Sequence, residues 1–287
     1  MDARWKECYI MQFFSIGIKK KDWQFKDKLL ERLSSNIPEG FEITEEQYDK
    51  LCYINFIYDY KKEAEDVIDI TDMLAHGIGS AFAQFLLYDI REELIDDIIE
   101  KEYFYFDEID SQRILEKATD RNLGYDERKW AAYIHGRLTE FFSEGRILSM
   151  EGFIRFRLKD YIEELKYIID GSVDELLIDR EYNEFIKLLR YFVEIQEPKV
   201  EEVHVLLEGD KKYTLLDSGF REINNDMLED LAREISDNDI SYDDLLISSL
   251  ITIAPNKIVI HDSNKIKNTE LLKTIENVFC GKVEMRN

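Results

Sequence analysis

Hydrophobic residues recur at helical spacing throughout residues 149–196, the longest such pattern in the chain. At about 100° per residue they form one continuous face that should lie in a core. Its members are Met150, Ile154, Leu158, Tyr161, Ile162, Leu165, Ile168 and Ile169. Phe153, Phe156 and Tyr167 fall on a second, narrower strip among charged residues. Apolar residues on two faces are typical of a helix packed between neighbours, so this strip predicts internal packing; the alternative is a docking surface for another protein.

Alternating apolar residues before residue 62 predict a small βαββ unit. The expected elements are a strand at 13–18, a helix at about 22–35 and strands at 41–47 and 51–59. Cys52, Ile54 and Phe56 should share one face of the hairpin made by the last two strands. Residues 1–10 show neither helical nor strand periodicity, so we expect either a loose leader or a start codon assigned too far upstream, with Met11 as the true start.

Residues 63–198 have an almost unbroken helical pattern and predict a central helical bundle. The expected helices cover 69–106, 110–121, 125–145 and 149–196. Gly77 and Gly79 lie inside the first of them, where a glycine costs up to ~1 kcal/mol relative to alanine. That cost indicates a structural reason for glycine, so we expect a close helix–helix approach or a bend at this point.

Residues 199–287 return to a mixed pattern and predict a small C-terminal α/β sheet of four strands. The expected elements are strands at 200–209 and 211–217, helices at 224–235 and 241–254, a strand at 257–261, a helix at 268–279 and a strand at 282–285. The last three form a βαβ unit, whose strands run parallel with a right-handed crossover. Pro38, Pro198 and Pro255 all fall at expected helix-to-strand boundaries. The fold class is therefore α+β, mostly helical.

The charge balance narrows the possible partners. Acidic residues outnumber basic ones by 62 to 38, and the resulting net charge of −24 repels nucleic acid and anionic lipid. Cys8, Cys52 and Cys280 are widely spaced and odd in number, which is typical of a reducing, cytoplasmic compartment. The most apolar window, 73–90, is shorter than the ~20 residues that cross a bilayer, so we expect no membrane insertion and a soluble protein.

Arg155, Phe156 and Arg157 are the first candidate binding residues, as an anion or partner site around an exposed aromatic ring. A simpler interpretation gives both arginines carboxylate partners on their own helix. Glu151 lies four residues before Arg155, and Asp160 lies three residues after Arg157. In so acidic a chain we favour this second interpretation.

The four histidines, His76, His135, His204 and His261, share no metal-ligand spacing, and we expect neither a metal nor a cofactor. His261 and Asp262 follow a strand expected to be parallel, and α/β sheets tend to bind ligands at that end of their strands. Polar residues that leave a strand more often form an ordinary loop, and no glycine-rich turn or catalytic motif accompanies these two.

Three segments of the chain resemble the YtxC-like family: EGFIRFRL at 151–158, EYNEFIKLLRYFVEIQ at 181–196 and TIAPNKIVIHD at 252–262. Proteins of this family occur in endospore-forming bacteria and carry a sporulation label without an established activity. The resemblance covers about residues 60–287 and implies a cytoplasmic protein that acts in sporulation. We therefore expect a non-enzymatic interaction or scaffold protein; the alternative is an enzyme or small-ligand-binding protein that uses the sheet edge near His261 and Asp262.

Overall fold

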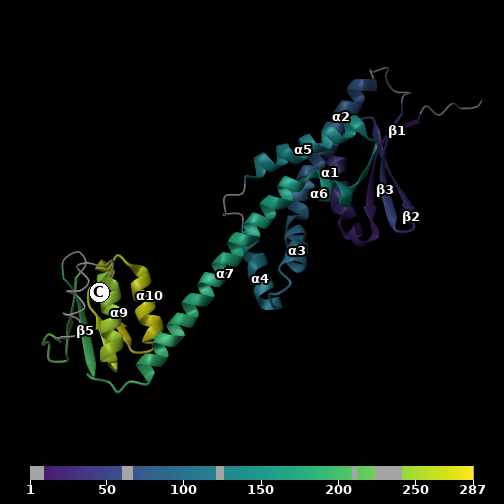
Figure 1. Cartoon of the computed structure of the whole chain (residues 1–287). Coiled ribbons are helices and arrows are strands. Elements are labelled where there is room, and N and C mark those ends of the chain that lie inside the picture. The colour runs from purple at the N-terminus through teal and green to yellow at the C-terminus, as the bar shows by residue number, and fades with distance from the viewer. Residues whose placement is uncertain (1–9, 60–66, 121–125, 209–211, 224–240, 287) are drawn as a thin grey trace, which may run out of the picture. The chain divides into compact units, whose positions relative to one another are not determined.

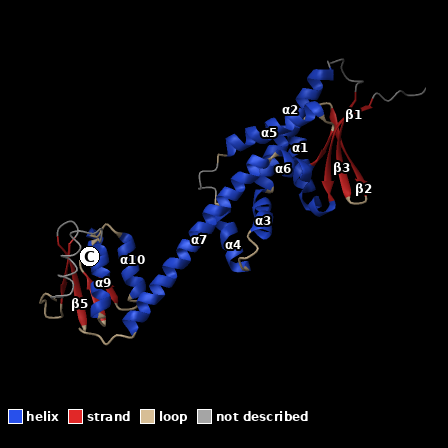
Figure 2. Ribbon diagram, viewed as in Figure 1, coloured by secondary structure: helices blue, strands red, loops and turns tan. Residues whose placement is uncertain are grey.

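The computed structural model describes residues 10–59, 67–120, 126–208, 212–223 and 241–286. The chain divides into two compact units, residues 1–176 and residues 177–287, here called unit 1 and unit 2. Both combine helices with a small sheet, so the mostly helical α+β class is confirmed (Figures 1 and 2). Unit 1 contains the predicted βαββ unit together with most of the predicted helical domain, because their buried residues form one continuous core.

The sheet of unit 1 has four strands in the order β2-β3-β1-β4. Their bounds are β1 Ile10–Lys19, β2 Phe41–Tyr48, β3 Leu51–Asp59 and β4 Ile147–Ser149. The predicted hairpin β2–β3 is antiparallel, and β3 pairs with β1. The sequence analysis missed β4, which pairs in parallel with β1 across more than 130 residues of chain; three residues are too few to show a period. β1 begins at Ile10, so the last residue of the expected leader belongs to the sheet.

One face of β1 and β3 is apolar throughout. Phe14 lies opposite Phe56, and Ile16 lies opposite Ile54. All four side chains are buried, and Cys52, one pair further along, is also buried. The predicted alternation of β3 is therefore confirmed, and it directs one face of the sheet into the core of unit 1.

Helices make up the rest of unit 1. They are α1 Lys26–Asn36, α2 Val67–Gln84, α3 Arg91–Glu102, α4 Glu108–Thr119, α5 Glu127–Glu144, α6 Met150–Arg157 and the first half of α7 Lys159–Glu194, with a 3₁₀ turn at Lys20–Phe25. The expected helix 69–106 is broken: one π-helical turn, Phe85–Asp89, ends α2, and Ile90 leaves helical geometry before α3 begins. Across the described ranges, none of the helices combines the length and the apolar content that a membrane span needs.

Gly77 and Gly79 let two neighbours approach α2 closely, as predicted. A Cβ atom on Gly77 would lie 2.5 Å from the backbone oxygen of Asn36, at the end of α1. A Cβ atom on Gly79 would lie 2.8 Å from the ring of His135 on α5. Real Cβ atoms do not approach other atoms so closely, so glycine is required at both positions for α1 and α5 to pack where they do.

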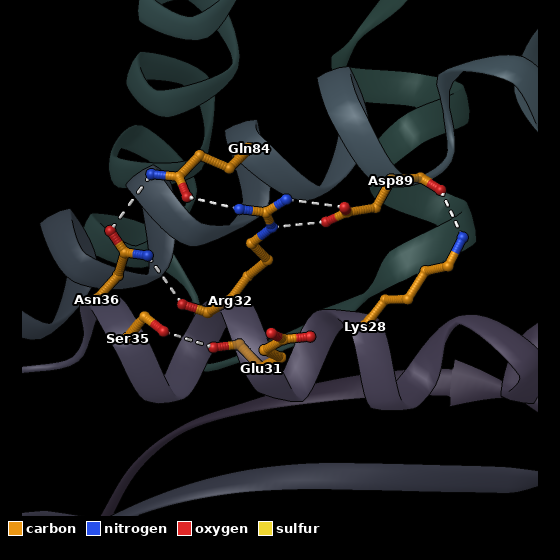
Figure 3. A network of polar contacts seen from close by, with 7 residues as sticks. All are labelled: Lys28, Glu31, Arg32, Ser35, Asn36, Gln84 and Asp89. Atoms are coloured by element: carbon orange, nitrogen blue, oxygen red, sulfur yellow. Dashed lines mark hydrogen bonds and ion pairs between the residues drawn. The ribbon is translucent and has the colours of Figure 1, made fainter.

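A polar network fastens α1 to the π-helical end of α2 (Figure 3). The guanidinium of Arg32 donates to both carboxylate oxygens of Asp89, at 2.7 and 2.8 Å, and Lys28 donates to the backbone oxygen of Asp89 at 3.0 Å. Gln84 accepts from Arg32 and donates to Asn36, both at 3.5 Å. The hydrogen bonds to Asp89 raise the pKa of Arg32 above its ordinary value. Because bidentate pairs fix orientation, this network sets the angle between the two helices.

The stretch 149–196 is not one helix. Ser149 caps α6, Leu158 (φ −108°, ψ 35°) interrupts the helix, and α7 then continues to Glu194. The predicted core face is largely confirmed, with Ile154, Ile162 and Ile168 half-buried and the rest buried: Met150, Leu158, Tyr161, Leu165 and Ile169.

The predicted internal packing of the second strip is wrong for two of its three residues. Phe153 is buried, with its ring 5.7 Å from that of Phe82. Phe156 is 63% exposed and Tyr167 is 76% exposed. The interruption at Leu158 changes the helical phase between α6 and α7, so the three aromatics do not form a continuous strip.

Unit 2 is the predicted α/β sheet, with strand order β6-β5-β7-β8. Its elements are the second half of α7, β5 Glu202–Glu208, β6 Lys212–Leu216, α9 Tyr242–Ile253, β7 Lys257–Ile260, a 3₁₀ turn at Ser263–Lys265, α10 Thr269–Val278 and β8 Val283–Met285. β5, β7 and β8 are parallel neighbours. The two crossovers advance in the same direction, so right-handedness places α9 and α10 on the same face of the sheet (Figure 2).

The three prolines lie at helix-to-strand boundaries, as the sequence analysis predicted. Pro38, Pro198 and Pro255 each follow a helix and precede a strand, at the ends of α1, α7 and α9. The expected helix at 224–235 and most of the expected leader lie outside the described residues.

Leu165→Ala should lower the free energy of unfolding of unit 1 by about 2–5 kcal/mol, because Leu165 is fully buried and its removal leaves a cavity. Phe156→Ala should change it by less than about 0.5 kcal/mol, because that ring is exposed. Urea unfolding followed by tryptophan fluorescence measures both free energies, since Trp23 and Trp130 lie in unit 1. Equal losses in the two variants would contradict this description of α6 and α7.

Arg32→Lys should lower the same free energy by about 1 kcal/mol, since an ammonium cannot make the two parallel hydrogen bonds to Asp89. Arg137→Lys is the matched control, because Arg137 pairs with Glu140 on the surface of a single helix. The same fluorescence measurement should find almost no change in the control. A loss no greater for Arg32→Lys than for Arg137→Lys would show that the network does not hold α1 in place.

Candidate functional site

The first predicted binding residues lie together at the end of α6. The guanidinium carbon of Arg155 lies 5.5 Å from the ring centre of Phe156, and that of Arg157 lies 6.0 Å from the ring centre of Phe141. Within the described residues neither arginine forms an ion pair, and Glu151 is instead bonded to Lys19 of β1. The arginines therefore contact aromatic faces rather than the carboxylates that the sequence analysis favoured.

His261 and Asp262 lie at the C-terminal end of β7, as predicted. Asp262 has a left-handed backbone (φ 51°) and forms an ion pair with Lys265 at 3.0 Å. His261 lies opposite the side chain of His204, with Nε2 3.0 Å from Nδ1 of the buried partner. The sequence analysis treated these histidines separately. Their proximity follows from the parallel register of β5 and β7, in which Val205 is paired with Ile260.

His204 is enclosed on its other side by an aromatic ring. Phe220 stacks on it, with ring centres 4.6 Å apart and an angle of 11° between the planes. A buried imidazole between a second imidazole and a phenyl ring is a polar element inside a mainly apolar sheet. Within the described residues no group of three or more metal-ligating side chains surrounds it. The cluster therefore offers hydrogen bonding at the sheet edge, without a complete metal site.

The second half of α7 presents apolar residues on two sides. Ile186 and Val193 are buried in the core of unit 2, where half-buried Leu189 packs beside them. Tyr182 and Arg190 hold the helix against α10, through Thr274 at 3.1 Å and the backbone oxygen of Asn277 at 3.2 Å. This side accounts for the attachment of α7 to unit 2.

The other side of the same half-helix is exposed. Five large apolar side chains on it are 44–64% exposed: Ile178, Phe185, Leu188 and Phe192 on α7, and Ile195, which continues its last turn. We call these five residues the α7 apolar face. At 100° per residue the face is centred about 100° around the helix from the buried side. The spacings of 7, 3, 4 and 3 residues between its members are those of the inner positions of a coiled coil.

Hydrophobic residues scattered singly over a surface need no explanation, but five aligned along one helix do. The sequence analysis missed the face as a site because residues 181–196 contributed to one helical pattern without a division between buried and exposed sides. The heptad spacing was the available signal.

Comparison with known proteins supports the resemblance. The YtxC-like family matches residues 76–284, from the middle of α2 to β8. The chain belongs to the YtxC-like family. A similar protein, the uncharacterized protein YtxC of Bacillus subtilis (strain 168), is 27% identical over 210 residues, which cover 70% of this chain and 73% of that protein. No solved structure matches.

The family match covers most of this YtxC-like protein but not its N-terminal strands. It includes α5, α6, the whole of α7 and all the described elements of unit 2. Strands β1, β2 and β3 lie before it. The α7 apolar face and the residues near His261 both fall inside the family match, so both are open to comparison across the family.

Proposed function

We propose that this YtxC-like protein is a non-enzymatic interaction protein that binds a helix of another protein on the α7 apolar face. The observation that carries the proposal is the exposure of five large apolar residues at heptad spacing. A helix whose own apolar residues repeat every 3.5 positions can insert them between these side chains. Burying a Phe or Leu in this way contributes about 1.5–3 kcal/mol each, enough for specific binding after the cost of association.

The charge on this helix favours a basic partner over a second copy of the chain. Glu181 occupies the inner heptad position between Ile178 and Phe185. In a parallel pair of identical helices, Glu181 would face its own copy, and in an antiparallel pair it would face Phe192. The first arrangement brings like charges together and the second buries a carboxylate against a ring. A partner helix with a lysine or arginine at this point avoids both costs, and the net charge of −24 attracts it.

The cellular setting is part of the same proposal. The family resemblance supports a role in sporulation, and the widely spaced cysteines support the cytoplasm. Cys52 is buried and Cys280 is exposed, and both are free thiols; Cys8 lies outside the described residues. The strong negative charge supports a protein partner rather than nucleic acid. A gene disruption that leaves spore counts unchanged would remove the sporulation part of the proposal and leave the binding surface to be tested by itself.

The double variant Phe185→Lys with Leu188→Lys should abolish partner binding and leave the fold intact, because both side chains are exposed. Full-length tagged protein is cross-linked in the cells that produce it, purified, and compared with the variant by mass spectrometry. The matched control is Phe156→Lys, an exposed phenylalanine on another helix. We expect a partner that is retained by the control and lost by the double variant, with unchanged circular dichroism in all three proteins.

Two results would overturn this proposal. One is an identical set of partners for the wild type and the double variant. The other is a concentration-dependent dimer, measured by sedimentation, that the double variant alone loses; this would make the occupant a second copy. Loss of partners in the Phe156→Lys control instead would move the interaction to α6 and to Arg155 and Arg157.

The alternative function is small-ligand binding or catalysis at the sheet edge near His261 and Asp262. One observation favours it, the 3.0 Å contact between His261 and buried His204. Saturation-transfer NMR with a library of small anionic and neutral metabolites should then identify ligands that bind the wild type and not His261→Ala. His76→Ala is the control, because it removes a histidine of unit 1. If no ligand in the library binds in this way, the small-ligand alternative is rejected and the interaction function stands.

A further inference from the structure

Two histidines that are 59 residues apart in sequence meet on the surface of unit 1. Nδ1 of His76, on α2, lies 3.1 Å from Nε2 of His135, on α5. The two rings are stacked, with centres 5.0 Å apart and planes inclined by 28°. Ring nitrogens at this distance share a single proton, so the pair is joined by one hydrogen bond when both imidazoles are neutral.

The pair lies in an open pocket of about 720 Å³ between α1, α2 and α5. The residues that line it are Asn36, Pro38, Asp72, Met73, His76, Gly77, Ser80 and His135. Asp72, His76 and Ser80 are spaced by four residues, so they follow one another along one face of α2. The pocket therefore presents a carboxylate, two imidazoles and a hydroxyl on its walls.

The glycines of α2 make this arrangement possible. The Cβ atom that an alanine would carry at position 79 would lie 2.8 Å from Cδ2 of His135, so only glycine admits the ring. Gly77 in the same way admits the end of α1, whose residue Asn36 forms another wall. The two glycines lie about 200° apart around α2, so each admits a different neighbour that forms part of the pocket wall. Their conformational cost of about 1 kcal/mol each is offset by this packing.

We propose that His76 and His135 bind a divalent transition-metal ion, of the Zn²⁺ or Ni²⁺ class, at the mouth of this pocket. If each nitrogen lies at the usual ~2.0–2.1 Å from the ion, a separation of 3.1 Å gives a nitrogen–metal–nitrogen angle of about 100°. That angle lies between square-planar and tetrahedral values. The exposed ring of His76 has room to turn its lone pair from the partner ring toward the ion.

The protonation and charge of the surroundings agree with a cation. Burial, and then the nearby His76, lower the pKa of His135, and the neutral imidazole is the form that binds metals. The net charge of −24 attracts cations and disfavours the opposite possibility, a phosphate or carboxylate on two protonated histidines. Nitrogen donors select zinc, nickel or copper over magnesium and calcium, which prefer oxygen.

The other coordination positions are open. In the described part of the chain no third side chain lies close enough to complete a set of three ligands. Asp72 lies one helical turn from His76 and lines the same pocket, where it can accept a hydrogen bond from water on the ion. A site with two protein ligands and open positions is typical of exchangeable binding rather than of a structural metal that holds a fold.

The test is isothermal titration of the full-length protein with Zn²⁺, Ni²⁺ and Mg²⁺, each added alone. We expect one equivalent of Zn²⁺ and of Ni²⁺ to bind, and no comparable heat from Mg²⁺. His76→Ala and His135→Ala should each weaken binding by at least about tenfold. His261→Ala is the matched control. The other histidine pair contains His204, which is only 5% exposed beneath Phe220 and has no room to turn toward a hydrated ion, so this variant should leave the affinity unchanged.

Circular dichroism and the melting temperature confirm that each variant is folded. If His135→Ala is not folded, His76→Ala decides the question, because its side chain is exposed. Binding that all three variants share, or that only His261→Ala loses, would overturn the proposal. The absence of Zn²⁺ and Ni²⁺ binding by the wild type up to millimolar concentration would do so as well.

Discussion

The packing of α2 against α1 and α5 is the interaction on which unit 1 depends. It requires two positions on α2 to have no Cβ atom, since a side chain on Gly77 or Gly79 would overlap Asn36 or His135. The bidentate bond between Arg32 and Asp89 holds the same helix pair at its other end (Figure 3). Close packing of this kind leaves little freedom, so the walls of the pocket and the distance between His76 and His135 are consequences of how the core is built.

Helix α7 contributes differently to the two units. Its first half is buried on one side through Tyr161, Leu165 and Ile169, as a helix on the edge of a core should be. Its second half packs on unit 2 through Ile186 and Val193 and also exposes the α7 apolar face. Exposing this much apolar surface costs solubility, and it is retained in proteins mainly where a partner covers it.

The histidines show how tertiary structure can create chemistry that the sequence conceals. All four of them are paired, one pair in each unit, at separations of 59 and 57 residues. One pair forms where two helices cross, and the other where two parallel strands lie side by side. Neither arrangement produces a short motif, because the residues that meet belong to different elements.

Local periodicity was enough to predict most elements of this protein, since the spacing of apolar residues reflects which side of a helix or strand is buried. It predicted the β2–β3 hairpin, the C-terminal βαβ unit and the buried positions of Leu158 and Leu165. It did not predict β4, because three residues carry no period, and it predicted neither the interruption at Leu158 nor the exposure of Phe156. The sequence also showed that two glycines lie in a helical segment, but it did not show which residues pack against them. Only the tertiary structure decided which histidines meet across 59 and 57 residues. Helix crossing and strand register bring them together, and both depend on the whole core rather than on any one segment.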